Sequence, residues 1–193
     1  ETVENTAVGT IKRTTVTAAD TITIIITALL LVTSCFGGKK ADERGYIVKV
    51  GEKVPNFELK FTDGTSKSIK SFRGKYVMLQ FTASWCSVCR QEMPYIESEI
   101  WQKFKENPKF ELFGIDLKES AEQTIDFAQQ IPVTYPITLD PDGKIFELFC
   151  DPKAGVTRNI IIDPEGEIIL LTRLFEMEEF NSMVELLEKS LSE

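Results

Sequence analysis

The feature that most constrains the fold is a pair of cysteines at the junction of a buried strand and a helix. The run YVMLQFTA at residues 76–83 is a largely apolar stretch, as expected of a central strand covered on both faces. Residues 87–107 then place their apolar side chains at helical spacing. Cys86 is therefore expected at a helix N-terminus, where free backbone N–H groups favour a thiolate over a thiol.

The second cysteine of the pair, Cys89, lies three residues later and one helical turn into the same helix. It is expected beside Cys86 in space and shielded by the helix. This position suits it to resolve a mixed disulfide formed on the first cysteine. The spacing predicts a redox disulfide in which Cys86 attacks and Cys89 releases.

Three other uses of a CxxC pair compete with redox chemistry. Zinc needs about four nitrogen or sulfur ligands, and the chain has no His and no second CxxC pair. A c-type haem needs His directly after the second cysteine, where this chain has Arg90. A purely structural disulfide remains the alternative, although a strand before the pair and a helix after it favour reactivity. We therefore expect no metal and no cofactor.

The rest of the chain from Tyr46 alternates strands and helices without an internal repeat. The pattern predicts strands at 57–61 and 110–116, helices at 120–131 and 176–192, a short helix or turn at 144–149, a hairpin over 158–173, and a helix kink at Pro94. This order is typical of an α/β domain with a central mixed β-sheet flanked by helices on both faces. Its central strands should be parallel and its last hairpin antiparallel.

The first residues have the order of an export signal. Lys12 and Arg13 precede an apolar stretch at 21–32 that is too short to span a membrane, and Val-Thr-Ser-Cys follows at 32–35. This order resembles a bacterial lipoprotein signal, which implies cleavage before Cys35 and its lipidation. We predict a signal peptide at 1–34, a flexible tether at 35–45 and a folded domain at 46–193.

The net charge limits the partners that the chain can bind. It carries 22 Lys and Arg against 30 Asp and Glu, a formal charge of −8. Phosphate backbones are bound by basic patches, and the Lys and Arg of this sequence form none. We therefore expect no nucleic-acid partner.

Several segments together resemble a known family. FTASWCSVCRQEMP, VGEKVPNFEL, SFRGKYVMLQF and NIIIDPEGEI are similar to the membrane-tethered disulfide reductases of the TlpA and ResA type, within the AhpC/TSA redoxins. The resemblance covers about residues 50–190. It implies a thioredoxin-like fold and thiol-disulfide exchange with disulfide-containing exported proteins. It also implies a periplasm-facing place in the bacterial cell envelope and electrons from a membrane thiol donor.

The sequence departs from thioredoxin beneath the cysteines. Thioredoxins place a buried Asp six residues before the first cysteine, and this chain has Gln80, which cannot ionise. The ResA type has a Glu on the loop after the next strand, and the resemblance assigns Glu119 to that position. Glu119 is thus expected to shuttle protons for the cysteines. The alternative is a solvated acidic residue at a helix start that Ser120 caps.

A second departure concerns the loop that faces the cysteines. Thioredoxins carry a cis-Pro there, and the resemblance puts Thr157 in its place, so a cis bond is not obligatory. Thr157 is expected to offer its backbone to a substrate, and Arg158 to contact the Cys86 thiolate or an acidic substrate. The alternative for Arg158 is an ordinary surface residue. Trp85 is expected to cover the edge of the disulfide, where core packing is the alternative. Cys150 has no partner at CxxC spacing and is expected to be a half-buried free thiol.

Two rival functions need separate consideration. Thr157-Arg158 and the following hairpin resemble a peroxiredoxin-like thiol peroxidase, but such enzymes place Thr three residues before the reactive cysteine, where this chain has Ala83. An envelope copper chaperone would need a wider cysteine spacing and a His ligand. Among thiol-disulfide oxidoreductases, Ser87-Val88 between the cysteines supplies no positive charge, which favours a reductase over an oxidant.

Overall fold

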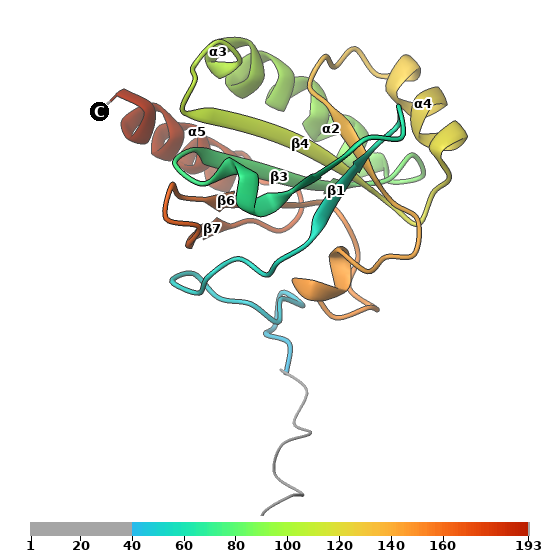
Figure 1. The fold of residues 1–193 in the computed structure, drawn as a ribbon, viewed down its shortest axis with the longest axis horizontal. Coiled ribbons are helices and arrows are strands. Elements are labelled where there is room, and N and C mark those ends of the chain that lie inside the picture. Colours follow the sequence, from blue (N-terminus) through green and yellow to red (C-terminus); the bar gives the residue numbers. More distant parts are fainter. Residues whose placement is uncertain (1–39, 193) are drawn as a thin grey trace, which may run out of the picture. The chain divides into compact units, whose positions relative to one another are not determined.

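A seven-stranded mixed sheet forms the frame of the domain (Figure 1). The structure, a computed structural model, describes residues 40–192. The strands are β1 (Glu58–Phe61), β2 (Ser66–Ser68), β3 (Tyr76–Thr82), β4 (Phe110–Leu117), β5 (Ile137–Asp140), β6 (Arg158–Ile162) and β7 (Ile168–Leu171). Their order is β2-β1-β5-β4-β3-β6-β7. β3, β4 and β5 run parallel, and the β6–β7 hairpin joins β3 antiparallel, as predicted.

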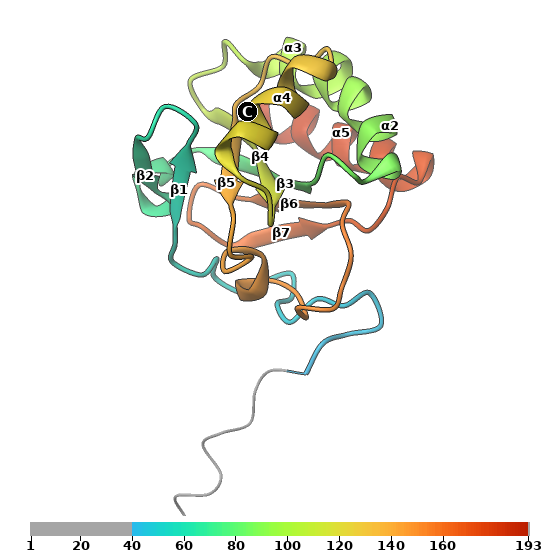
Figure 2. The same ribbon diagram turned by 90° about the vertical axis from the view of Figure 1, so that its right-hand side faces the viewer.

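The α-helices gather on one face of this sheet (Figure 2). They are α2 (Ser87–Ile96), α3 (Gln102–Phe104), α4 (Ala121–Gln130) and α5 (Met177–Ser192), with the π-helical segment η2 (Glu97–Trp101) between α2 and α3. The opposite face is covered by the short 3-10 helices η1 (Ile69–Phe72) and η3 (Phe146–Leu148) and by the N-terminal segment. Helical segments thus lie on both faces, as predicted, but the long ones share a face.

The two faces bury separate apolar clusters. Met78 of β3 points to the cluster shared with α2, α4 and α5, whereas its neighbours Val77 and Leu79 point to the cluster under η1 and η3. This alternation follows from the strand geometry, which directs successive side chains to opposite faces. β3 is therefore buried on both faces, and the end of β3 is a fixed position from which the cysteine loop begins.

Three details differ from the sequence prediction. Two strands were not predicted: β2 (Ser66–Ser68), which pairs antiparallel with β1, and β5 (Ile137–Asp140), which pairs in parallel with β4 and antiparallel with β1. The helix after the cysteines changes to π geometry at Glu97, three residues after Pro94. Proline has no N–H for the helical ladder, so a local change of hydrogen bonding near it is expected.

Residues of the predicted tether pack against the domain. The guanidinium of Arg44, in the predicted tether, contacts the Glu179 carboxylate at 2.5 Å. Next to it, the hydroxyl of Tyr46, the first residue of the predicted domain, donates to Thr172 O at 2.6 Å. The segment after Asp42 therefore takes part in the fold. The predicted signal peptide, Cys35 and the first tether residues lie outside the described residues. Within residues 40–192, the structure has no helix with the length and apolar character of a membrane span.

Candidate active site

The two cysteines form a disulfide at the start of α2. Their Cα atoms are 5.3 Å apart. Cys86 is the N-cap residue of the helix, and its Sγ accepts a hydrogen bond from the Cys89 N–H at 3.1 Å. A backbone N–H and the positive end of the helix dipole thus face this sulfur, which favours its thiolate on reduction.

The two cysteines differ in their access to solvent. The side chain of Trp85, directly before the pair, is 65% exposed, Cys86 is 6% exposed, and Cys89 is completely buried. A substrate disulfide approaching from solvent meets Trp85 and Cys86 first. This asymmetry agrees with attack by Cys86 and resolution by Cys89.

A buried carboxyl group lies one helical turn beyond Cys89. Glu92 is 1% exposed and accepts hydrogen bonds from Asn159 Nδ2 at 2.7 Å, Gln80 Nε2 at 3.0 Å and Thr157 Oγ1 at 3.1 Å. The Tyr135 hydroxyl donates to Gln80 Oε1 at 2.7 Å, which fixes the Gln80 amide so that its nitrogen faces Glu92. Strands β3 and β6, together with Thr157 directly before β6, therefore supply the donors that hold this side chain.

The acidity of Glu92 is set by opposing effects. Burial disfavours the charged form and raises its pKa to about 7, aided by the negative charge of Glu179, while the bonds from Gln80, Asn159 and Thr157 act in the other direction. A carboxyl group with a pKa near neutral suits proton exchange with a thiol. Sequence reasoning missed Glu92, although it shares the buried face of α2 with Cys89 and Met93.

The predicted site residue Glu119 contacts Ser84, in the loop before Cys86. It is 5% exposed, and Ser84 donates to it through both the backbone N–H, at 2.6 Å, and the hydroxyl. Burial raises its pKa, but the two Ser84 bonds, Asp116 and the charge of Arg90 outweigh burial and lower it. Glu119 is therefore not the solvated residue of the alternative interpretation. The cap of α4 is Ser120, as that interpretation proposed.

The loop opposite the cysteines contains a cis peptide bond between Val156 and Thr157, although no proline there makes it obligatory. In this conformation Thr157 Oγ1 contacts Glu92 and Phe81 O. The Thr157 carbonyl accepts a hydrogen bond from the Leu174 N–H at 3.1 Å. The Thr157 carbonyl is thus occupied, and the side chain positions Glu92.

Arg158 does not point to the cysteines. It is 1% exposed, its Nε donates to Gly155 O at 2.8 Å, and its Nη2 donates to Arg44 O at 2.6 Å. Its guanidinium carbon lies 4.5 Å from the centroid of the Tyr46 ring. These partners hold the guanidinium inside the domain and away from solvent, whereas the expected role needs it directed at Cys86 or at an acidic substrate.

The geometry gives little support to the two rival functions. The Thr82 hydroxyl points to Met93 Sδ at 3.5 Å, so neither it nor Arg158 is directed at Cys86 as a peroxidase would require. Among residues 40–192, no group of three or more His, Cys, Asp or Glu side chains is arranged to hold a metal ion. Cys150 is a free thiol, as predicted, but it is completely rather than half buried, and burial raises its pKa to about 12.

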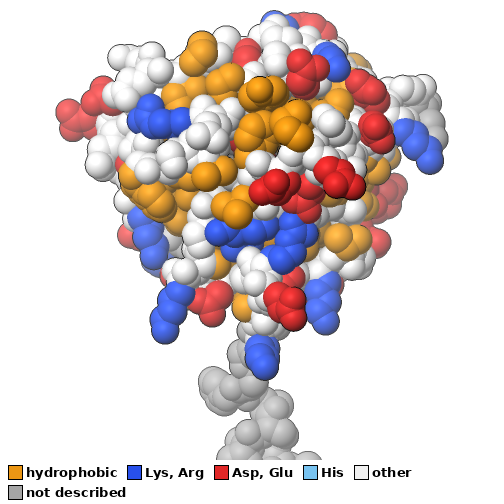
Figure 3. Space-filling view, turned by 180° about the vertical axis from the view of Figure 1, so that it is seen from behind, with side chains coloured by type: hydrophobic (Ala, Val, Ile, Leu, Met, Phe, Trp, Pro, Cys, Tyr) orange, Lys and Arg blue, Asp and Glu red, His pale blue; other side chains and the backbone are white. Residues whose placement is uncertain are grey.

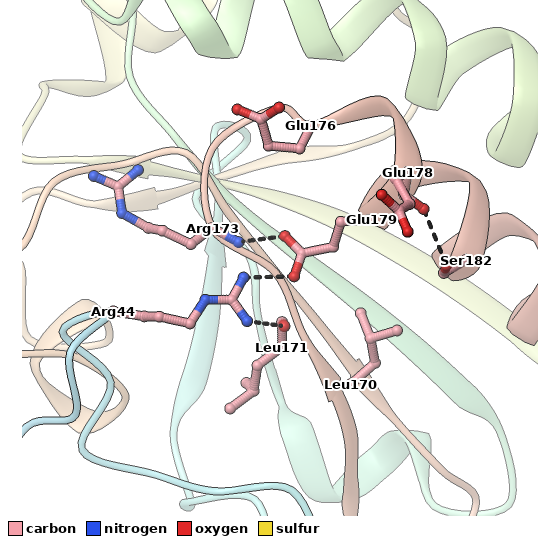
Figure 4. A pocket seen from close by; sticks show the side chains of 8 residues that line it. All are labelled: Arg44, Leu170, Leu171, Arg173, Glu176, Glu178, Glu179 and Ser182. Carbon is pink, nitrogen blue, oxygen red and sulfur yellow. Dashed lines mark hydrogen bonds and ion pairs between the residues drawn. The ribbon is translucent and has the colours of Figure 1, made fainter.

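A pocket of about 700 Å³ lies elsewhere on the domain (Figure 4). In it Glu179 bridges the Arg44 guanidinium and the Arg173 backbone N–H, and Leu170 and Leu171 contribute apolar walls. Figure 3 shows that acidic and basic side chains adjoin one another on the face seen from behind. None of the residues lining the pocket flanks the disulfide, so the pocket is separate from the site above.

Comparison with known proteins assigns the family. A model of the AhpC/TSA family matches residues 50–170. The chain belongs to the AhpC/TSA family. Among its relatives, the thiol-disulfide oxidoreductase ResA of Bacillus thuringiensis subsp. konkukian is 30% identical over 131 residues, which cover 65% of this chain and 73% of ResA.

Two solved structures are similar to this chain in sequence and in fold. A protein from Bacteroides thetaiotaomicron, described only as a candidate protein disulfide isomerase, is 52% identical with a TM-score of 0.75, covering 77% of this chain and 94% of that one. The thioredoxin domain of a Bacteroides vulgatus thiol-disulfide oxidoreductase is 25% identical with a TM-score of 0.62, covering 72% and 98%. The predicted thioredoxin-like fold and thiol-disulfide oxidoreductase activity are confirmed.

Proposed function

We propose that this chain is an exported, lipid-anchored disulfide reductase in which Cys86 attacks and Cys89 resolves. The observation that carries the assignment of roles is the difference in burial between the two sulfurs at the start of α2. Only Cys86 combines partial access with a backbone N–H aimed at its sulfur. Trp85, exposed beside it, is the proposed contact for the substrate protein.

The reaction follows from these positions. The Cys86 thiolate attacks a disulfide of an exported protein, a mixed disulfide forms, and one substrate thiolate leaves. Cys89 loses its proton and attacks the Cys86 sulfur, which releases the second substrate thiolate and leaves the Cys86–Cys89 disulfide. Two electrons have then passed to the substrate. A membrane thiol donor is proposed to return the pair to the dithiol.

We propose that Glu92 accepts the proton that Cys89 loses. Glu92 follows Cys89 by one turn on the same buried helix face, and its pKa of about 7 lets it take and return a proton near neutral pH. Glu119, the residue expected from the sequence, is a weaker base because Ser84 binds its carboxylate and its pKa is lowered. The role of Glu119 as a proton shuttle stays a competing hypothesis.

The reduction potential of the Cys86–Cys89 pair tests the direction of the reaction. Ser87 and Val88 place no positive charge between the cysteines that would stabilise the reduced thiolate. We expect a potential nearer to the roughly −270 mV of thioredoxin than to the roughly −120 mV of a strong oxidant. A value close to that of the oxidant would contradict the reductase assignment.

The lipid anchor rests on the Val-Thr-Ser-Cys order at 32–35. Lipidation of Cys35 would hold the chain to the membrane, on the periplasm-facing side of the bacterial cell envelope. Mass spectrometry of the mature N-terminus is expected to find acylated Cys35, and Cys35→Ser is expected to release the protein from membranes. An unmodified N-terminus, or a variant that stays attached, would refute the anchor while leaving the redox assignment intact.

A further inference from the structure

Asp116 is a buried carboxyl group that the mechanism above does not use. It lies in β4 and is completely buried. Its Oδ2 accepts a hydrogen bond from Thr124 Oγ1 at 2.6 Å, but its Oδ1 has no donor among the residues that the structure describes. A buried acceptor without a donor, on a charged group, is costly in free energy.

Glu119 follows Asp116 by three residues and is also buried. The two carboxyl groups act on each other through a side-chain hydrogen bond, which raises the pKa of Asp116 and lowers that of Glu119. Two ionised carboxylates can only accept, so such a contact requires a proton on one of them. The Ser84 N–H and hydroxyl both donate to Glu119, which favours its ionised form and leaves the proton on Asp116.

The remaining surroundings agree with this placement of the proton. Arg90 of α2 acts on Glu119 as a nearby positive charge, and α4 contributes the Thr124 hydroxyl to Asp116. In the sheet, Asp116 lies opposite Thr82 of β3 and Leu139 of β5, neither of which carries a charge. Burial, followed by the effect of Glu119, raises the pKa of Asp116 to about 7.

The loop before Cys86 depends on this pair. Glu119 holds both the N–H and the hydroxyl of Ser84, while the Ser84 carbonyl accepts from Arg90 Nε at 2.7 Å. The Cys86 N–H in turn donates to Ala83 O at 3.1 Å. The backbone that presents Cys86 is therefore held by Glu119, from the loop after β4, and by Arg90 of α2.

We propose that Asp116 and Glu119 share one proton, and that this carboxylic acid–carboxylate pair positions the loop of residues 83–85 that presents Cys86. Both are positioning residues, because they act on Cys86 through Ser84. The proposal rests on the assignment of Cys86 as the attacking thiol. When Asp116 releases the proton to solvent, two negative charges are in contact beneath the loop, and the loop loses its fixed position.

The protonation state is tested directly by carboxyl ¹³C NMR of the full-length oxidised protein over a range of pH. We expect the Asp116 resonance to titrate near neutral pH, with a simultaneous change at Glu119. Titration of Asp116 at its ordinary pKa of about 4 would overturn the proposal. Because the oxidised protein is observed without turnover, this result is independent of whether the chain reduces disulfides.

The effect on Cys86 is tested by the pH profile of its alkylation in the reduced protein. In wild type, the alkylation rate should show one inflection at the pH where Asp116 ionises and another at the pH where the Cys86 thiol ionises. Asp116→Asn keeps a donor towards Glu119, so it should lack this inflection and react within about twofold of wild type at acidic pH. Asp116→Ala removes the donor and should change the rate several-fold at every pH.

A matched control is Glu97→Gln, because Glu97 is also held by a backbone N–H and a hydroxyl, those of Thr134, but has no carboxyl partner. It should leave the Cys86 profile unchanged. Equal profiles for wild type, Asp116→Asn and Asp116→Ala would refute the positioning role. If the Asp116 variants do not fold, the NMR titration of the wild type decides. If Asp116 titrates near neutral pH but the cysteine pair is inactive in disulfide exchange, the proposed function is refuted and the Asp116–Glu119 proposal is not.

Discussion

The two sulfur atoms of the disulfide belong to cysteines with Cα atoms only 5.3 Å apart, yet their surroundings differ in almost every respect. Cys86 follows an exposed Trp85 and a loop that Ser84 ties to Glu119. Cys89 is buried on the helix face that also carries Glu92. Helix position and burial, rather than residue type, thus distinguish the attacking cysteine from the resolving one.

The same comparison extends to the two glutamates. Glu92 is held by donors that do not overcome the effect of burial, so its pKa is raised to about 7. Glu119 is held by Ser84 and lies near Arg90, so its pKa is lowered. One carboxyl group can therefore exchange a proton near neutral pH, while the other stays ionised and acts as a hydrogen-bond acceptor.

The largest effects are expected from the cysteines themselves. Cys86→Ser should abolish exchange with a protein disulfide, because the accessible nucleophile is lost. Cys89→Ser should still attack, but it should accumulate a mixed disulfide through Cys86 because no thiol resolves it. Non-reducing electrophoresis with mass spectrometry measures the trapped species. Equal trapping by the two variants would contradict the assigned roles.

The glutamates are separated by the kinetics of resolution. Glu92→Gln should slow release of the mixed disulfide by about 10² at neutral pH, and the defect should shrink as the pH approaches the free thiol pKa of about 8.5. Rapid-mixing measurements over about pH 5 to 9 follow this step. Glu119→Gln is the matched control, and its profile should lack this recovery. If only Glu119→Gln shows the pH-dependent defect, the proton role returns to Glu119.

The sequence predicted the regular parts of this arrangement because each is encoded locally. The apolar run of β3, the helical spacing of α2 and the cysteines between them lie within one continuous segment. β5 was missed because it is a strand of only four residues, Ile137–Asp140, whose identity depends on pairing with β4 and β1. Short strands carry too little periodicity to be recognised alone.

The carboxyl groups were harder to predict, since their environments join distant segments. Glu92 depends on Gln80, Asn159 and Thr157, which lie 12, 67 and 65 residues away. Its position on the apolar face of α2, between Cys89 and Met93, was nevertheless a signal that it is buried. Asp116 was treated as part of a strand, and nothing in the local sequence reveals its contact with Glu119.

The stability of the fold should also distinguish the two glutamates. The pKa of Glu92 rises from 4.5 to about 7 on folding, so the folded chain binds more protons than the unfolded chain between these values. Stability is therefore highest below about pH 4.5 for this group and falls by on the order of 3 kcal/mol as the pH rises through 7. Urea unfolding at several pH values should show a smaller fall for Glu92→Gln. A slope unchanged by this substitution would mean that Glu92 ionises normally.

The smallest effect on the stability of the fold is expected from substitution of the exposed Trp85. Because Trp85 is 65% exposed, Trp85→Ala should change the free energy of unfolding by only about 0.5 kcal/mol. An exposed aromatic side chain next to Cys86 is suited to packing against a substrate protein. We therefore expect a several-fold loss of kcat/KM for a protein disulfide and little change for a small disulfide such as oxidised glutathione.

Tyr95→Ala, which removes another exposed aromatic side chain, 45% exposed on α2, is the control. Equal losses for both disulfides would indicate that Trp85 acts on the cysteines themselves rather than on the protein substrate.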